Sequence, residues 1–313
     1  MEFFRIRKDI PFMNYAFAFN ILSIIIISFS IYSLTTKGLN FSIEFTGGID
    51  VQMSFTTPPE IESIRHKVEE VGYQDVPVQR FGAATEILIR LPTPKTGDAG
   101  SEVNKVVDAI KQIDSSVETR RIDFVGPQVG KELAIDGITA LIIVAIGIII
   151  YLAIRFEWRL AVASVIANMH DVLVILGLFA FFQWEFSLPV LAGTLAVLGY
   201  SVNESVIIFD RVRESFRNMR TAKISAIMDH SLTINISRTV ITHGSTQIMV
   251  LTMLIFGGPA LHNFAIALTI GILFGIYSSM FISCPLAMYF GVDRKQFIKK
   301  PKDKGQNPDG AII

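Results

Sequence analysis

The sequence predicts a membrane protein with six transmembrane α-helices and a small α+β domain of ferredoxin-like type between the first and second helices. The composition supports a membrane protein. Hydrophobic residues are 51% of the 313 residues, charged residues are 18%, and the mean hydropathy is +0.49. A soluble globular chain carries about 25% charged residues. The apolar residues also gather in six long runs, and only the segment 35–132 is polar enough to form a water-soluble domain.

Each apolar run approaches or exceeds the length of about 17–25 residues that a helix needs to cross the hydrocarbon core. The six predicted spans are Tyr15–Leu34, Leu133–Ile154, Leu160–Phe182, Leu188–Phe209, Thr239–Gly257 and His262–Phe290. A set of buried helices in a soluble protein is the alternative, and six such runs in one chain argue against it. The first run is too long for the apolar part of a signal peptide and has no clear cleavage site, so we interpret it as an uncleaved span.

The distribution of Lys and Arg predicts the orientation, because cytoplasmic loops carry an excess of these residues. With the N-terminus in the cytoplasm, the cytoplasmic pieces hold 17 of the 28 Lys and Arg residues: 1–14, 155–159, the loop 210–238 and the basic tail 291–313. The opposite loops Gln183–Ser187 and Gly258–Leu261 hold none. We therefore expect both termini in the cytoplasm and the domain 35–132 on the outer side.

The soluble segment shows the element order β-α-β-β-α-β of the split ferredoxin-like motif. The patterns predict strands at Ile49–Phe55, Val76–Phe81, Glu86–Leu91 and Ser116–Val125. One helix begins after Pro58-Pro59, and a second one contains Val103, Val106, Val107 and Ile110. The segment contains no catalytic constellation, and His66 among charged neighbours is interpreted as a solvated helix residue.

Several classes of function are disfavoured by the sequence. The single cysteine, Cys284, excludes a disulfide framework and a cysteine-rich zinc site. The glycines of Gly126–Lys131 have three residues between them where a phosphate loop has four, so we interpret this segment as a turn into the second span. We expect no enzyme activity, no metal, no cofactor, no nucleotide and no nucleic acid, and hence another source of energy for any transport.

Polar residues inside the predicted spans are the strongest functional signal, because ionisable groups in hydrocarbon are costly and usually face a bundle interior or a water-filled path. They lie on three spans: His170 and Asp171 on the third; Tyr200, Ser201, Asn203 and Glu204 on the fourth; Arg238, His243 and Gln247 on the fifth. Structural pairing between helices is the alternative. A cluster on three spans favours a functional path.

Depth along the helices supports such a cluster, since each residue adds 1.5 Å. Glu204 and His243 lie at similar depths, about 6–8 Å from the inner ends of their predicted spans. His170 and Asp171 lie about 15 Å into the third span, level with Tyr200 and Ser201. Arg238 stays protonated and is expected to act as a countercharge.

These residues resemble those of the SecF family of protein-export membrane proteins, which is similar to proton-driven transporters of the RND type. The resemblance covers residues 10–290. Its motifs are Phe45-Thr-Gly-Gly48, Val125–Leu133, His170-Asp-Val172, Gly199–Glu214 and Ser237-Arg-Thr239. Two positions depart from the family pattern, since Glu204 and Glu44 stand where family members usually have Asp. Both changes keep the carboxylate and lengthen its arm.

The resemblance implies an RND-like half bundle in the bacterial inner membrane, with the domain 35–132 in the periplasm. It implies an auxiliary subunit that acts with SecD and the SecYEG channel on exported, unfolded polypeptides, driven by the proton-motive force. The family's transport carboxylate and arginine correspond to Glu204 and Arg238, and we expect a proton pathway that also includes His170, Asp171, Asn203, Tyr200, His243 and Asp210. Two other functions stay open: a non-transporting scaffold of the translocon, and half of an RND-type exporter of small molecules or lipids.

Overall fold

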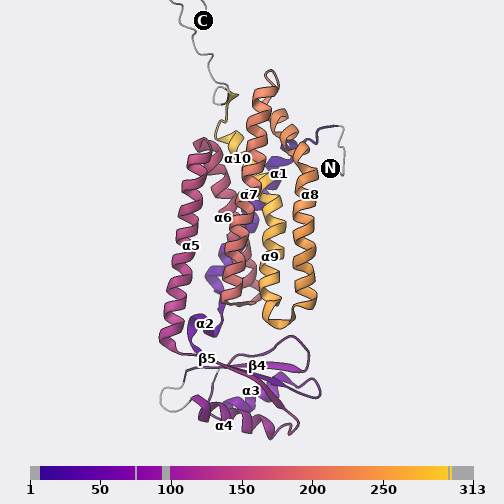
Figure 1. Cartoon of the computed structure of the whole chain (residues 1–313). Helices are drawn as coiled ribbons and strands as arrows, with labels where there is room; N and C mark the ends of the chain where they lie inside the picture. The colour runs from indigo at the N-terminus through magenta and orange to yellow at the C-terminus, as the bar shows by residue number, and fades with distance from the viewer. Residues whose placement is uncertain (1–7, 75, 94–98, 295–296, 298–313) are drawn as a thin grey trace, which may run out of the picture.

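The computed structural model describes residues 8–74, 76–93, 99–294 and 297. Within these residues, six helical spans form a bundle, and an α+β domain covers one end of it (Figure 1). We call this end the domain end and the opposite end the far end. Most of the predicted basic tail, and Arg5 and Arg7 of the N-terminal segment, lie outside the described residues.

The prediction of six transmembrane helices is confirmed. Five of the spans are single helices: α1 (Phe12–Thr36), α5 (Pro127–Arg155), α6 (Trp158–Phe182), α7 (Leu188–Asn218) and α8 (Ile224–Phe256). The sixth consists of α9 (Gly258–Ser278), a π-helical turn η1 (Ser279–Ser283) and α10 (Cys284–Tyr289). The π-helical turn directly precedes Cys284-Pro285, where the sequence predicts a kink, because proline lacks the N–H that a regular helix would use.

Two helices extend well beyond their predicted spans. The segment 210–238, predicted as a loop, continues α7 to Asn218 and belongs to α8 from Ile224, so that only residues 219–223 separate the two helices. Apolar runs reveal only the part of a helix that meets hydrocarbon, whereas the polar continuation is stabilised by pairs such as Arg211–Glu214, at 2.6 Å.

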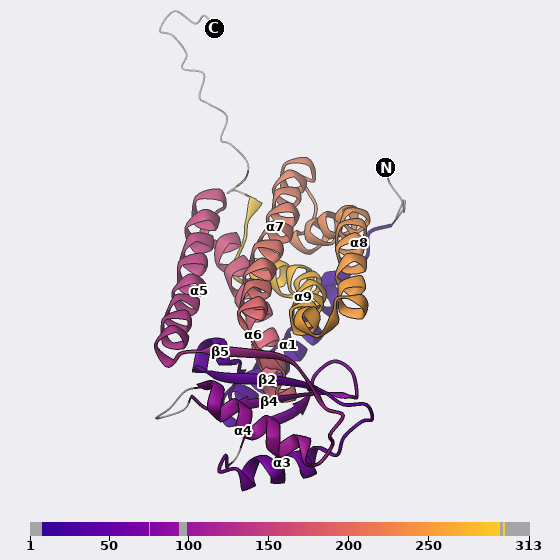
Figure 2. The same cartoon turned by 60° about the horizontal axis from the view of Figure 1, so that its bottom comes forward.

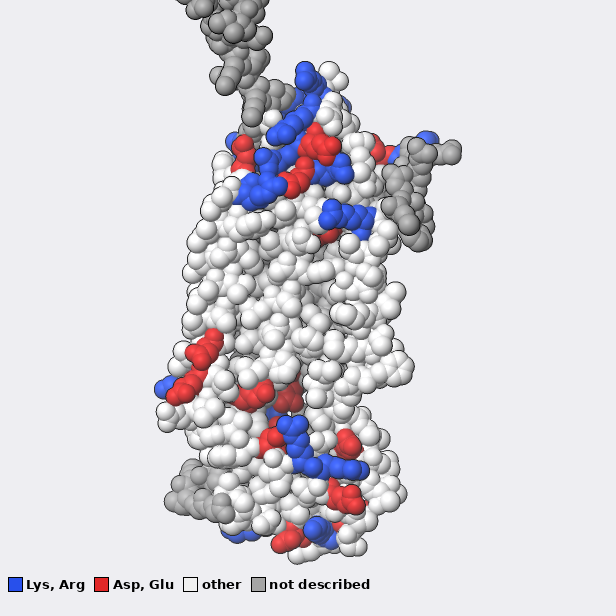
Figure 3. Space-filling view, viewed as in Figure 1, with Lys and Arg blue, Asp and Glu red and all other residues white. Residues whose placement is uncertain are grey.

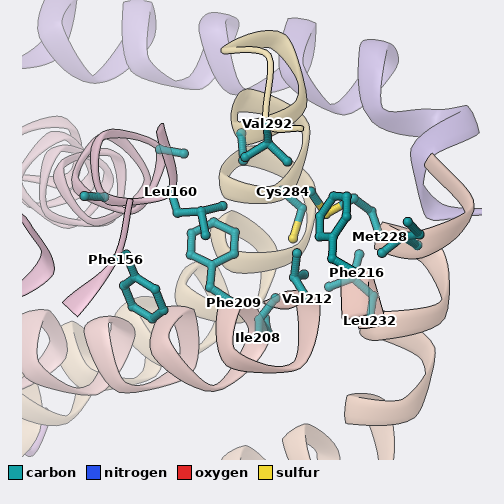
Figure 4. Close-up of a cluster of buried hydrophobic side chains, with 14 of the residues drawn as sticks. Phe156, Leu160, Ile208, Phe209, Val212, Phe216, Met228, Leu232, Cys284 and Val292 are labelled. Atoms are coloured by element: carbon teal, nitrogen blue, oxygen red, sulfur yellow. The ribbon is translucent and has the colours of Figure 1, made fainter. Parts of the chain in front are cut away.

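Helix α7 runs through the centre of the bundle and packs against α6, α8 and α9 (Figure 2). Helices α1, α5 and α8 are mostly exposed within their apolar windows, as expected for helices that face lipid. At the far end, a cluster of aromatic and aliphatic side chains holds α6, α7, α8 and α10 together (Figure 4). Phe209, Phe216 and Leu160 in this cluster are fully buried, so the far end is a packed anchor.

The α+β domain has the predicted ferredoxin-like topology. Its strands β2 (Gly48–Ser54), β3 (Val78–Arg80), β4 (Glu86–Leu91) and β5 (Glu118–Val125) form an antiparallel sheet in the order β3-β4-β2-β5. Helices α3 (Ile61–Glu70) and α4 (Ala99–Lys111) cover the face of the sheet that points away from the bundle (Figure 1). Alternate side chains of β2 and β4, such as Val51 and Ile89, pack against buried side chains of these helices, such as Ile110 of α4. The other face of the sheet therefore looks toward the bundle.

Three short elements that the sequence does not predict join the domain to the bundle. Strand β1 (Asn40–Phe41) pairs in parallel with β6 (Glu185–Phe186), and α2 (Ile43–Thr46) leads to Gly47-Gly48. A Cβ atom on Gly48 would lie 2.8 Å from the Leu91 carbonyl oxygen, and one on Gly130 would lie 2.7 Å from the Gly47 nitrogen. The first turn of α5 thus packs directly on this glycine pair, because neither position has room for a side chain.

Charged residues gather at the two ends of the molecule and leave an uncharged band between them (Figure 3). Lys and Arg are prominent at the far end (Figure 3). The band matches the apolar windows of the six spans. The protein is therefore a multi-pass membrane protein.

Candidate functional site

Glu204 lies at the interface of α7 and α8, near the middle of α7. It is 16 residues from Leu188 and 14 from Asn218, which is about 24 Å and 21 Å along the helix. Its side chain is buried, with the residue 4% exposed. Thr239 Oγ1 donates a hydrogen bond of 2.6 Å to Glu204 Oε1, and His243 Nε2 lies 3.3 Å from Oε2. The pair Glu204–His243 is an ion pair whenever the imidazole is protonated.

A line of polar side chains leads from His243 toward the domain end. The Tyr200 ring meets the His243 ring edge-on, with centroids 4.8 Å apart. Tyr200 Oη lies 3.4 Å from Thr246 Oγ1, and Gln247 Nε2 lies 3.3 Å from Thr269 Oγ1 on α9. His243 Nδ1 and Gln247 Oε1 are buried without a partner among the described residues. This line gives Glu204 a polar route toward the domain end.

Arg238 and Asn203 lie on the outside of the bundle. Both residues are exposed. Within the described part of the chain, the ion pair of Glu204 is with His243, and no ion pair joins Glu204 to Arg238. The sequence predicts Arg238 as the countercharge of Glu204, and in the structure the residue in direct contact with the carboxylate is His243.

His170 and Asp171 form a second buried cluster, between α6, α7 and α9. Asp171 Oδ2 lies 2.6 Å from Ser201 Oγ and 2.8 Å from Ser278 Oγ, and Asp171 Oδ1 lies 3.2 Å from His170 Nδ1. Ser201 Oγ also lies 3.0 Å from Asn168 Oδ1. Ser201 and Glu204 are on the same helix, so the two clusters lie less than one helical turn apart along α7.

Asp210 lies apart from both clusters, near the far end. Its carboxylate pairs with Arg155, and Arg213 lies 3.7 Å away. Both guanidinium groups lie over the Phe156 ring, at 5.1 Å and 5.8 Å from its centroid. Asp210 thus joins α7 to the end of α5 through a local ion pair.

At the domain end, Glu44 binds the start of the helix that carries Glu204. Glu44 Oε2 accepts a hydrogen bond of 2.6 Å from the backbone N–H of Leu188, the first residue of α7. The N-cap residue Ser187 makes no such bond with its own side chain. A carboxylate at a helix N-terminus is stabilised by the unpaired N–H groups and the helix dipole. Glu44 therefore links α2, next to the glycine pair, to α7.

A second link joins β4 of the domain to β6 of the bundle. Arg90 Nε and Nη2 donate to the two carboxylate oxygens of Asp50, at 2.9 Å and 3.1 Å, and Nη2 also donates to Glu185 Oε1 at 2.5 Å. Burial alone would lower the pKa of Arg90, but the hydrogen bond and charge of Asp50, together with Glu185, raise it. Burial raises the pKa of Glu185, although the charge of Arg90 opposes this shift.

Two cavities of about 690 and 700 Å³, each lined by both polar and apolar residues, lie between the domain and the bundle. Carboxylates from both parts line the second one: Glu44, Asp50, Glu86, Asp123 and Glu185. These carboxylates make the lining of the second cavity acidic, which does not suit an uncharged apolar ligand.

Sequence reasoning missed the partners of the buried acids and the junction residues. Thr239, Asn168 and Ser278 are hydroxyl or amide residues inside apolar runs, and their polarity there was an available signal, although no spacing pattern sets them apart. Glu44 binds Leu188, 144 residues away in sequence, so no local pattern could identify that contact.

Comparison with known proteins places these residues in regions that two family models match. The family model "Protein export membrane protein SecD/SecF, C-terminal" matches residues 105–293, and the model "SecD/SecF GG Motif" matches residues 32–59. The first region contains both buried clusters, and the second contains Glu44, Gly47 and Gly48.

Full-length relatives agree with the family models. The chain is 40% identical over 305 residues to the protein translocase subunit SecF of Vibrio alginolyticus, covering 97% of this chain and 96% of the relative. It is 35% identical over 311 residues to the subunit of the same name from Escherichia coli O157:H7, covering 98% and 96%.

A solved structure has the same architecture. The crystal structure of SecDF from Thermus thermophilus, described as a translocon-associated membrane protein, matches with a TM-score of 0.82 and 29% identity. The match covers 91% of this chain and 39% of that chain, so this chain corresponds to less than half of the SecDF molecule.

Proposed function

The chain belongs to the SecF family of protein-export membrane proteins, and on this premise we propose that it uses the proton-motive force to promote polypeptide translocation. As a protein translocase subunit it acts as an auxiliary component of the Sec machinery together with SecD. The finer proposal is that it acts on unfolded polypeptides leaving the SecYEG channel, late in translocation. It performs mechanical rather than enzymatic work.

The proposed orientation has both termini in the cytoplasm and the α+β domain in the periplasm of a bacterial inner membrane. It is supported by the bias of Lys and Arg toward the predicted cytoplasmic pieces. In this orientation Tyr200 and Gln247 lie on the periplasmic side of Glu204, the side from which protons are driven inward. The proton pathway is proposed to comprise Glu204, His243, Tyr200, Asn203, Arg238, His170 and Asp171, with Asp210 at the cytoplasmic end.

The observation that carries the proposal is the buried contact of Glu204 with His243 across the interface of α7 and α8. Protonation of Glu204 removes its negative charge and weakens the attraction to the imidazole. One proton moving down 100 mV releases about 2.3 kcal/mol. This amount is enough to bias a two-state arrangement of the helices roughly fifty-fold.

The links at the domain end transmit a movement of α7 to the domain. Glu44 accepts a hydrogen bond from the first N–H of α7, and Arg90 donates one to Glu185, three residues before that helix. A shift of α7 relative to α8 therefore changes the position of the glycine pair and the sheet. The domain would alter its hold on the emerging polypeptide with each protonation of Glu204.

The proposal is tested by Glu204→Gln, which keeps the shape of the side chain and cannot ionise. The control is Glu214→Gln on the same helix, where the carboxylate pairs with Arg211 at the exposed far end. We expect both variants to assemble with SecD and SecYEG. Only Glu204→Gln should lose the stimulation of export by a proton-motive force in membrane vesicles. Full stimulation in that variant would favour the scaffold function instead.

A further inference from the structure

A group of buried polar side chains, distinct from the Glu204–His243 contact, lies between α6, α7 and the sixth span. We call it the hydroxyl seam. Every one of its residues is at most 1% exposed: Ser164, Asn168, Asp171, Ser201, Ser205, Ser278 and Ser279. Polar groups buried this completely are normally all hydrogen-bonded, so the seam has to be explained by its partners.

Asp171 is the only carboxylate of the seam, and two hydroxyl groups and one imidazole surround it. Its contacts are Ser201 on α7, Ser278 on α9 and His170 on α6. The next titratable groups are Tyr277 on α9, whose ring lies 5.9 Å from the His170 ring, and Glu204, less than one turn from Ser201 on α7. No Lys or Arg pairs with Asp171 in the described ranges of the chain.

The hydrogen bonds of the seam can accommodate both charge states of Asp171. Ser201 has one hydroxyl hydrogen but lies within hydrogen-bond distance of both Asp171 and Asn168. When Asp171 is ionised, Ser201 donates to it and accepts from the Asn168 amide, turned so that its nitrogen faces Ser201. When Asp171 is protonated, it donates to Ser201, which donates to the Asn168 carbonyl oxygen. Ser278 likewise reaches either Asp171 or the Gly275 carbonyl oxygen.

Polar atoms that have no partner among the described residues continue the seam toward the far end. Ser164 Oγ and Asn168 Nδ2 are one turn apart on α6, and Ser205 Oγ follows Ser201 by one turn on α7. Ser279 Oγ begins the π-helical turn. Ser164 is six residues from the far-end start of α6, about 9 Å along the helix. Unpartnered groups on three facing helices are typical of a path that water molecules occupy.

We propose that Asp171 is a second binding site for the transported proton, in addition to Glu204. The hydroxyl seam then conducts the proton from Asp171 to the far end through bound water. The inference rests on the proposed proton-coupled function. It divides the pathway into two carriers: Glu204 receives the proton from the domain end, and Asp171 passes it to the far end. The hydrogen bonds that join Asp171, Ser201 and Asn168 can reverse direction, and this reversal permits both the ionised and the protonated state of Asp171.

The first test is infrared spectroscopy of the complex with SecD, reconstituted in lipid and titrated with pH. A protonated carboxylic acid has a carbonyl stretch that a carboxylate lacks. We expect one such band to disappear in Asp171→Asn and a different one in Glu204→Gln. Ser201→Ala, which leaves the carboxyl group intact, should shift the midpoint of the Asp171 band. If Asp171→Asn and Ser201→Ala both leave every titrating band unchanged, the inference is wrong.

The second test measures proton flux into vesicles that contain a pH-sensitive dye. Asn168→Leu removes the relay amide at nearly constant volume and should reduce the flux at least tenfold. Asn20→Leu is the matched control, since the Asn20 amide nitrogen on α1 is also buried without a partner in the described part of the chain and lies outside the seam. Equal flux in both variants would overturn the seam as the route.

The two tests separate this inference from the proposed function. If Glu204→Gln retains full flux and export while Asp171→Asn loses both, the role of Glu204 fails and the role of Asp171 stands. If Glu204→Gln loses flux while Asp171→Asn and Asn168→Leu retain it, the proposed function stands and the second site is refuted.

Discussion

The buried carboxylate of Glu204 is held by one hydroxyl and one imidazole, and no guanidinium group of the described residues contacts it directly. This arrangement suits a group that changes its charge. A histidine can gain or lose a proton near neutral pH, whereas an arginine cannot. From the sequence, Arg238 is favoured over His243 as the partner of Glu204, because the sequence shows charge and depth but not which side of α8 faces α7. The structure places Thr239 and His243, four residues apart, on that side.

We therefore predict that His243→Ala abolishes the coupling of export to the proton-motive force. The substitution leaves Glu204 buried without its partner, which costs about 3–5 kcal/mol if the carboxylate stays charged. Glu204 should instead remain protonated. Arg238→Lys should keep partial function, and Arg238→Met should lose coupling, since Arg238 corresponds to the transport arginine that the family resemblance implies.

The measurement is the export rate at a series of imposed proton-motive forces for these three variants. Normal coupling in His243→Ala together with loss in Arg238→Met would return the main role to Arg238. Fluorescence-detected gel filtration in detergent shows whether each variant is folded.

Glu185 gives the junction a pH dependence of unusual sign. Burial raises its pKa above the ordinary value of 4.5, so the folded state binds the proton more readily than the unfolded state. The stabilising contribution is fully present below the ordinary pKa and is lost as the pH rises through the raised pKa. Glu185→Gln mimics the protonated form and should remove this loss.

Thermal unfolding of the full chain in detergent, measured from pH 4 to pH 8, about the range that spans the carboxylate titration, checks this prediction. Wild type should become less stable relative to Glu185→Gln as the pH rises. A wild type that gains stability relative to the variant over this range would show that the attraction of Arg90 outweighs burial.

Among the elements, α2, the glycine pair and the first turn of α5 form a closely packed joint between the domain and the bundle. We predict that Gly130→Ala destabilises the protein by about 1–3 kcal/mol, because its Cβ atom would lie 2.7 Å from the Gly47 backbone nitrogen. The matched control is Gly147→Ala on the same helix, where a Cβ atom meets nothing within 4 Å. The control should be neutral or stabilising by up to about 1 kcal/mol.

Thermal unfolding of both variants in detergent decides this prediction. A Gly130→Ala variant as stable as Gly147→Ala would mean that the joint opens without cost. The domain would then be only loosely held on the bundle.

At this scale most of the fold follows from local patterns. Long apolar runs determine the six helices, and alternation with a period of two determines β2 and β4. The pair β1 and β6 could not be predicted, since each strand has two residues and their partners are 145 positions apart, as in Asn40 and Glu185. The polar ends of α7 and α8 were missed because hydropathy reports contact with lipid and not helical structure.

For the whole molecule, the orientation follows from the distribution of charge. A reporter that is active only outside the cytoplasm should work when inserted at the turn near Gly72 of the domain. It should fail when inserted near Arg220, in the turn between α7 and α8. Activity at Arg220 would reverse the orientation and with it the direction of the proton pathway.

The sequence identifies the main residues of the candidate site but does not show that they form two separate clusters. The cost of polar groups in hydrocarbon identifies Glu204, His243, His170 and Asp171 from the sequence. Their division into two clusters depends on helix rotation and on hydroxyl partners such as Thr239 and Ser278, which no periodic pattern distinguishes from structural serine and threonine.

The central claim is that protonation of Glu204 couples the proton-motive force to export. It is tested most directly by the export rate of wild type, Glu204→Asp and Glu204→Gln as the imposed proton-motive force is increased in vesicles containing SecD and SecYEG. We predict that the rate rises with the force in wild type and, with a smaller slope, in Glu204→Asp, and that it stays flat in Glu204→Gln. A Glu204→Gln rate that rises with the wild-type slope would contradict the account.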